Sequence, residues 1–88
     1  MRAVHAIRQG EIEILEADAL DTSFLVGKQI SDLNLPRGIK ICAIMRGKDA
    51  KAVRPETMIM ADDRVILAAE AEHVSIAEKL FSVRVDFV

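Results

Sequence analysis

The sequence predicts a small α+β domain, and three observations support this prediction. Short apolar runs separated by polar turn residues recur along the chain, which is typical of the strands of a β-sheet. Two other segments repeat apolar residues at the spacing of a helix. The chain has 88 residues, of which 51% are hydrophobic, enough for one modest core. We therefore expect residues 1–88 to form a single domain.

The N-terminal segment predicts two strands joined by a turn. Residues 4–7 (VHAI) form a short apolar run, and residues 8–10 (RQG) have the composition of a turn. Residues 11–14 (EIEI) then alternate acidic and apolar side chains. This period of two is typical of a strand with one face in water, so the glutamates should be solvated.

A first amphipathic helix is predicted next. Residues 21–23 (DTS) offer side chains that can cap a helix N-terminus. Val26, Ile30 and Leu33 follow at positions i, i+4 and i+7, which places them on one helical stripe. The proline and glycine of residues 36–38 (PRG) should end this helix.

Three further strands are expected in the middle of the chain. Residues 39–45 (IKICAIM) are apolar on both alternating faces, which predicts a central strand covered on both sides, with Cys42 as a small buried hydrophobe. Residues 50–55 are short and basic and end in Pro55, features that protect an edge strand. Residues 64–69 (RVILAA) predict another continuous apolar strand.

The second helix is predicted after this strand. Glu70 and Glu72 favour a helix start because acidic side chains complement the positive end of the helix dipole. Val74, Ala77 and Phe81 then form a helical stripe.

The C-terminal residues 83–88 (VRVDFV) alternate strictly, which predicts a last strand. Its expected partner is the N-terminal run of residues 4–7.

Composition and motifs exclude several functional classes. The net charge is −2 and aromatic residues make up 3%, so neither a basic field nor a stacking surface for nucleic acid is present. No apolar stretch reaches the roughly 18 residues needed to enter and span a membrane. A single cysteine fits a reducing, cytoplasmic location. No serine or cysteine has the neighbours of a catalytic nucleophile, so we predict no catalytic residue and no enzyme.

The possible metal ligands have simpler interpretations. His5 and His73 lie far apart in the sequence, and we interpret each as a surface or strand-end residue. The carboxylate pairs at residues 11 and 13 and at residues 62 and 63 could hold a hard cation, but solvated acids on a strand or turn are commoner. We therefore predict no metal site in this domain.

Three methionines leave two interpretations open. Met45, Met58 and Met60 form an apolar patch together with Ile59. Methionine fills gaps in cores and also serves adaptable interfaces, so the patch belongs either to the core or to a dimer interface.

Several short motifs, in this order and spacing, resemble the TrkA-C family, the C-terminal half of the regulator of potassium conductance (RCK) domain. They are residues 23–28 (SFLVGK), 33–38 (LNLPRG), 43–47 (AIMRG) and 63–67 (DRVIL), with residues 4–10 and 80–81 extending the match over nearly the whole chain. One departure is Asp62, where the family usually places glycine. Aspartate tolerates positive φ better than most residues, so the turn can survive.

The resemblance implies a four- to five-stranded, mostly antiparallel sheet with two helices, dimerising with a second copy. It also implies that a Rossmann-type domain precedes this one in a longer chain and that NAD or ATP binds there, with no cofactor on this domain. The glycine-rich fingerprint of such a domain is absent from residues 1–88, so we expect the chain to be an excised C-terminal piece.

One candidate ligand site is Asn34, Arg37 and Lys40, which flank the Pro36 turn. A two-fold axis would double their positive charge, and in related regulators the groove between two copies binds anions such as cyclic di-AMP. A plain solvated turn is the competing interpretation.

Two functional hypotheses follow. In the first, the domain is a regulatory and homodimerisation module of a potassium uptake system, cytoplasmic and peripheral to the membrane through a potassium-transport subunit. In the second, it senses a small anion or cation at the dimer groove of another transporter or regulator.

Overall fold

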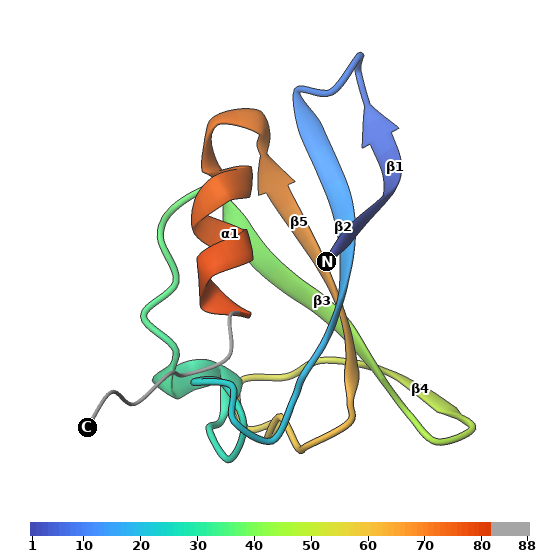
Figure 1. Cartoon of the computed structure of the whole chain (residues 1–88), viewed down its shortest axis with the longest axis vertical. Coiled ribbons are helices and arrows are strands. Elements are labelled where there is room, and N and C mark those ends of the chain that lie inside the picture. The colour runs from blue at the N-terminus through green and yellow to red at the C-terminus, as the bar shows by residue number, and fades with distance from the viewer. Residues whose placement is uncertain (82–88) are drawn as a thin grey trace.

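The computed structural model describes residues 1–81 and contains one five-stranded antiparallel sheet in the order β1-β2-β5-β3-β4 (Figure 1). The strands are β1 (Arg2–Ile7), β2 (Ile12–Asp18), β3 (Ile39–Arg46), β4 (Asp49–Ala52) and β5 (Arg64–Glu70). Two 3-10 turns, η1 (Ile30–Asp32) and η2 (Ala71–His73), and one helix, α1 (Val74–Leu80), complete the elements of the described chain. The predicted α+β class and antiparallel sheet are confirmed.

The core lies on one face of the sheet. Alternate residues of β5, namely Val65, Leu67 and Ala69, are fully buried there, as the period of two requires. The remaining core residues come from β2, β3, α1 and the loops: Leu15, Ala17, Ala19, Leu25, Ile39, Ile41, Ile44, Ile59, Ala77 and Phe81. Figure 1 shows α1 packed over this side of the sheet.

The second predicted helix is confirmed as α1. The 3-10 turn η2 precedes it and runs directly into its first residue, Val74. Ala77 and Phe81 of the predicted stripe are buried, and Val74 packs against the core. The amphipathic pattern therefore predicted both the helix and the face that it buries.

The first predicted helix is wrong. Gly27 adopts a φ of +85° and donates its amide hydrogen to the carbonyl of Ile59. Ile30 donates to the carbonyl of Thr57, so the backbone pairs with a distant segment instead of closing helical turns. Only η1 forms in this region. Val26 and Ile30 still pack on the core, so the same burial is achieved by a different backbone.

Residues 39–45 form the predicted interior strand, β3, but the described chain covers only one of its two faces. In β3, Ile39 and Ile41 are buried. Lys40, which lies between them, and Cys42, which follows Ile41, are exposed. The pairing with β5 shifts register between Ile41 and Ala43, which marks a β-bulge at Cys42. No described element covers the second face of β3, so the thiol is not a core group.

The sheet edges agree with the sequence. The short strand β4 is an edge strand and is exposed throughout, as the basic segment ending in Pro55 predicted. At the opposite edge, β1 pairs with β2. The predicted C-terminal strand of residues 83–88 lies outside the described residues, so its pairing with β1 stays a prediction.

In the part of the chain that the structure describes, no helix is both long and apolar enough to cross a membrane.

Candidate functional site

The sheet has a second face that the described residues leave uncovered, and we call its apolar part the open face. Cross-strand pairing places its members on one side: Ile7 opposite Ile12, Ile14 opposite Ala68, and Ala43 opposite Ile66. Ile7 and Ile12 are 40% and 36% exposed, and the other four members are half-buried. Contiguous apolar side chains that reach the surface are typical of a face that binds another protein.

Charged side chains border the open face at one end. Glu16 pairs with both Arg2 and Arg64, and Arg64 Nε also lies 3.4 Å from a carboxylate oxygen of Asp18. Opposite charges thus alternate across β1, β2 and β5. A charged border beside an apolar centre is common in protein interfaces.

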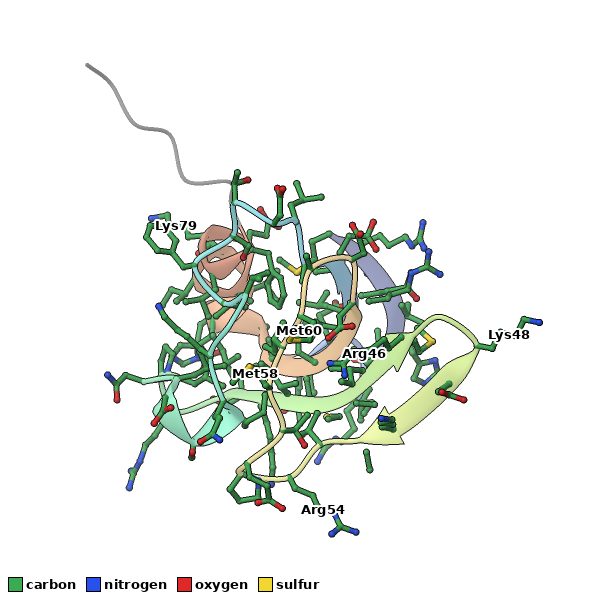
Figure 2. The ribbon with its side chains drawn as sticks, turned by 90° about the horizontal axis from the view of Figure 1, so that it is seen from below. Arg46, Lys48, Arg54, Met58, Met60 and Lys79 are labelled. Atoms are coloured by element: carbon green, nitrogen blue, oxygen red, sulfur yellow. The ribbon has the colours of Figure 1, made fainter. Side chains whose placement is uncertain are left out.

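A buried carboxylate with several hydrogen bonds lies directly before β5. Asp63 is fully buried, and its two carboxylate oxygens accept hydrogen bonds of 2.8 Å from Nε and Nη2 of Arg46. The backbone amide of Met60 donates a third bond of 2.9 Å. Arg46 Nη2 also donates to the Met58 carbonyl, and Figure 2 shows Arg46 beside the two methionines.

This bonding lowers the pKa of Asp63. The hydrogen bonds from Arg46 are the main cause, and they outweigh the effect of burial, which alone would raise the pKa. The Arg46 guanidinium, in turn, has a raised pKa because it donates to Asp63. Two of the motifs, residues 43–47 and 63–67, therefore meet in one ion pair that fixes the loop before β5.

The methionine patch is divided by the structure. Ile59 is fully buried in the core, and Met45 is half-buried. Met58 and Met60 are 41% and 44% exposed, on either side of Ile59. The core interpretation therefore holds for Ile59, and Met58 and Met60 are free to contribute to an interface.

The predicted ligand residues lie in two settings. Asn34 and Arg37 are exposed on the loop between η1 and β3. Lys40 is exposed on β3 and lines a hollow of about 280 Å³ against β2 and β5, a hollow that also contains Glu70. A carboxylate in the same hollow partly offsets the charge that Lys40 would offer to an anion. The anion site at these three residues stays a prediction.

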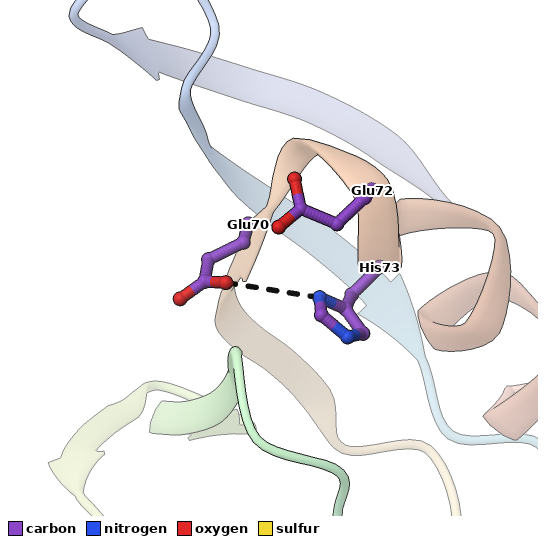
Figure 3. A group of neighbouring side chains, drawn as sticks. All are labelled: Glu70, Glu72 and His73. Carbon is purple, nitrogen blue, oxygen red and sulfur yellow. Dashed lines mark ion pairs between the residues drawn. The ribbon is translucent and has the colours of Figure 1, made fainter.

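A cluster for which the sequence analysis rejected a metal-binding role lies at the other end of β5. Glu70, Glu72 and His73 each place one potential ligand atom so that all three atoms lie within 4.8 Å of one another (Figure 3). Nδ1 of His73 lies 3.8 Å from Oε1 of Glu70. The signal was present as three potential metal-binding residues within four positions, but Glu70 and Glu72 were interpreted as helix-start residues.

Comparison with known proteins places the chain in a family. The sequence model of the TrkA-C domain matches residues 5–82. A Trk system potassium uptake protein TrkA of Azorhizobium caulinodans is 38% identical over 99% of this chain and 19% of its own length. TrkA of Vibrio alginolyticus is 38% identical over 89% of this chain and 18% of its own length.

The fold agrees with a solved structure described as an RCK domain with cda. That structure matches with a TM-score of 0.62 and 21% identity over 78% of this chain and 97% of the solved chain. The chain spans about a fifth of the length of the TrkA relatives, at 19% and 18%. With a family match that covers nearly all of it, this chain belongs to the TrkA-C domain family, as its motifs predicted.

Proposed function

We propose that this chain is a non-catalytic regulatory and homodimerisation module of a potassium uptake system. It passes the ligand state of a neighbouring nucleotide-binding domain to a membrane potassium-transport subunit at the cytoplasmic side. The relatives that match it carry the name of a potassium uptake protein, and the chain corresponds to about a fifth of their length. The neighbouring domain, with NAD or ATP as its ligand, belongs to the remaining part in this proposal.

The observation that carries the proposal is the open face of the sheet. Its centre is aliphatic, its rim is charged, and no described element covers it. In an 88-residue domain, an apolar face left in water costs a large share of a small stability. A second copy brought to this face would bury it, and the charged rim would set the register of the two copies.

Such a dimer can transmit a signal without chemistry of its own. A ligand that binds one arrangement of the neighbouring domains more tightly shifts the equilibrium between two arrangements of the dimer. The coupling equals the difference in binding free energy between the two states. The domain needs only to hold two copies together while the geometry between them changes.

The proposal is tested first by light scattering of the purified chain at micromolar concentration. We expect a mass of twice 9.7 kDa for the natural sequence. Ile66→Lys and Ile14→Lys place a charge in the middle of the open face and should give monomers. Leu20→Lys is the matched control, because Leu20 is 45% exposed and lies outside the strands. A monomeric natural chain would contradict the dimerisation role.

The role in transport is tested in cells. A chimera in which this chain replaces the matching segment of the Azorhizobium caulinodans TrkA should restore potassium uptake to a strain lacking TrkA. The same chimera with Ile66→Lys should fail, and the one with Leu20→Lys should work. Full uptake by the Ile66→Lys chimera would show that the open face has no part in regulation.

A ligand-sensing function is the second candidate, supported by the exposed Lys40 in its hollow on the sheet. Calorimetry with cyclic di-AMP, calcium, ATP and NADH separates the two functions. Binding that is abolished by Arg37→Ala combined with Lys40→Ala would favour the sensing function. Heat of binding that is unchanged by this double substitution would place the ligand elsewhere.

A further inference from the structure

We propose that Glu70, Glu72 and His73 form a binding site for a divalent transition-metal ion of the zinc class. This inference departs from the expectation of a metal-free domain, and it does not depend on the proposed function. It starts from one atom, Nδ1 of His73. Within residues 1–81, this is the one buried side-chain nitrogen or oxygen for which no hydrogen-bond partner is found.

A buried imidazole nitrogen without a partner is unusual, because leaving such a group unsatisfied costs free energy. The nearest carboxylate oxygen, Oε1 of Glu70, is 3.8 Å from Nδ1, which is too long for a hydrogen bond. Figure 3 shows Nδ1 turned toward the carboxylates of Glu70 and Glu72 and not away from them. The nitrogen therefore faces two anionic oxygen donors at a distance that leaves room between them.

The spacing suits a shared ion. A zinc ion binds nitrogen and oxygen at about 2.0–2.2 Å, so two ligands of one tetrahedral ion lie roughly 3.3 Å apart. The three potential ligand atoms lie within 4.8 Å of one another. The side chain of Glu70 is 49% exposed and Glu72 is also exposed, so both carboxylates can move inward by the remaining distance.

The donor set selects the class of metal. Calcium and magnesium prefer sites built only of oxygen, whereas imidazole favours zinc and its first-row neighbours. Two carboxylates and one neutral imidazole would neutralise a divalent charge. Three protein ligands leave a fourth position for water or for a group from another molecule.

The surrounding backbone holds the histidine in place. Gly38 has a φ of +88°, and a Cβ added to it would lie 2.8 Å from Nδ1 of His73 and 3.0 Å from the carboxylate of Glu70. The Glu70 amide also donates a 2.8 Å hydrogen bond to the Gly38 carbonyl. Gly38 thus closes the inner side of the cluster, and an ion enters from the solvent side, where Glu72 is exposed.

Isothermal titration calorimetry of the untagged 88-residue chain with zinc tests the proposal. We expect one zinc ion per chain, with calcium and magnesium unable to compete at equal concentration. His73→Gln and Glu72→Gln should each weaken zinc binding by about tenfold or more. His5→Gln and Glu56→Gln are the matched controls, because His5 and Glu56 are exposed and lie outside the cluster. Both controls should bind as the natural chain does.

A second readout does not depend on the variants folding well. In the natural chain, zinc should shift the imidazole nitrogen resonances of His73 in NMR spectra and leave those of His5 unchanged. Zinc should also raise the melting temperature of the natural chain.

Three results would each overturn the proposal. One is zinc binding without a shift of the His73 resonances. Another is equal weakening in His5→Gln and His73→Gln. The third is calcium binding as tight as zinc binding and unaffected by His73→Gln, which would mean an ordinary carboxylate surface.

Discussion

The two ends of β5 differ in how their buried polar atoms are hydrogen-bonded. At its start, the buried carboxylate of Asp63 accepts three hydrogen bonds of 2.8 to 2.9 Å, two from Arg46 and one from the Met60 amide. At its finish, the buried Nδ1 of His73 accepts and donates none. One end is saturated by the chain itself, and the other still has capacity for a bond.

This difference separates a structural polar group from a candidate binding group. Asp63 and Arg46 come from segments 17 residues apart and lock the loop before β5 onto β3. Glu70 is the last residue of β5 and His73 lies in η2 directly after it, and their carboxylate and imidazole remain 3.8 Å apart. We therefore expect substitutions at the first end to act mainly on stability, and substitutions of side chains at the second end to act mainly on ligand binding.

The largest expected effect is that of Asp63→Ala. Removing this carboxylate leaves the Met60 amide without a partner and opens a void at a fully buried position. The Arg46 side chain is 41% exposed and can turn toward water, which limits the loss. We expect the free energy of unfolding to fall by about 2–3 kcal/mol, measured by urea denaturation.

Asp21→Ala is the control for this substitution, because Asp21 is exposed in a turn. It should change the free energy of unfolding by no more than about 0.5 kcal/mol. Equal stability of the Asp63→Ala and Asp21→Ala variants would mean that the Asp63 end of β5 is not the structural lock that we describe.

The same ion pair predicts a pH dependence. The pKa of Asp63 is lower in the folded state than the value of about 3.9 in an unfolded chain. Its stabilising contribution is therefore complete above the unfolded pKa and is lost as the pH falls through the lower, folded pKa.

Thermal unfolding between pH 7 and pH 2 measures this contribution. Between pH 7 and about pH 5, Asp63 should add no slope, and below about pH 4 the natural chain should lose stability. Asp63→Asn carries no titrating group there, so its stability should fall less steeply. Parallel curves for the two proteins would remove Asp63 from the acid response.

A smaller effect is expected at Gly38, which lies against Glu70 and His73 at the C-terminal end of β5. Gly38→Ala must hold a side chain at a φ of +88° and also displace His73 and Glu70. Gly27→Ala is a matched control, because its φ is +85° and nothing lies within 4 Å of the added Cβ. We expect Gly38→Ala to be about 1 kcal/mol less stable than Gly27→Ala. Equal losses would mean that His73 and Glu70 yield freely to the added methyl group.

Much of the fold could be predicted from the sequence because apolar runs and the period of two report directly on strands. The helix predicted through Val26, Ile30 and Leu33 failed for a physical reason. Their spacing fits a helical stripe, but Gly27 takes positive φ and the chain pairs with residues 57–59. That pairing is long-range, and local periodicity carries no information about it. The bulge that exposes Cys42 is likewise set by the partner strand.

The candidate sites could be predicted only in part. Residues 43–47 and 63–67 were identified as motifs, but their ion pair depends on how the loop before β5 folds back on β3. The cluster at the end of β5 contains three potential metal-binding residues within four positions. Whether their side chains converge is decided by the 3-10 turn η2 and by Gly38, which comes from a remote part of the chain.

The smallest expected effect concerns Asp62, which lies next to Asp63 just before the first residue of β5. Asp62 adopts a φ of +71°, as the departure from the usual family glycine predicted, and its amide donates a 2.7 Å hydrogen bond to the Ala19 carbonyl. Glycine would relieve the strain of this left-handed conformation, but it would also lose more entropy on folding. Aspartate already tolerates the conformation, so the net gain from Asp62→Gly should be about 0.5 kcal/mol, or a rise of about 2–4 °C in melting temperature. Asp62→Ala should lower the melting temperature instead, because alanine has neither the freedom of glycine nor the local hydrogen bonding of aspartate. If both variants melt at the temperature of the natural chain, the turn relaxes at no cost, and the rigidity of this end of β5 comes from the Arg46–Asp63 pair alone.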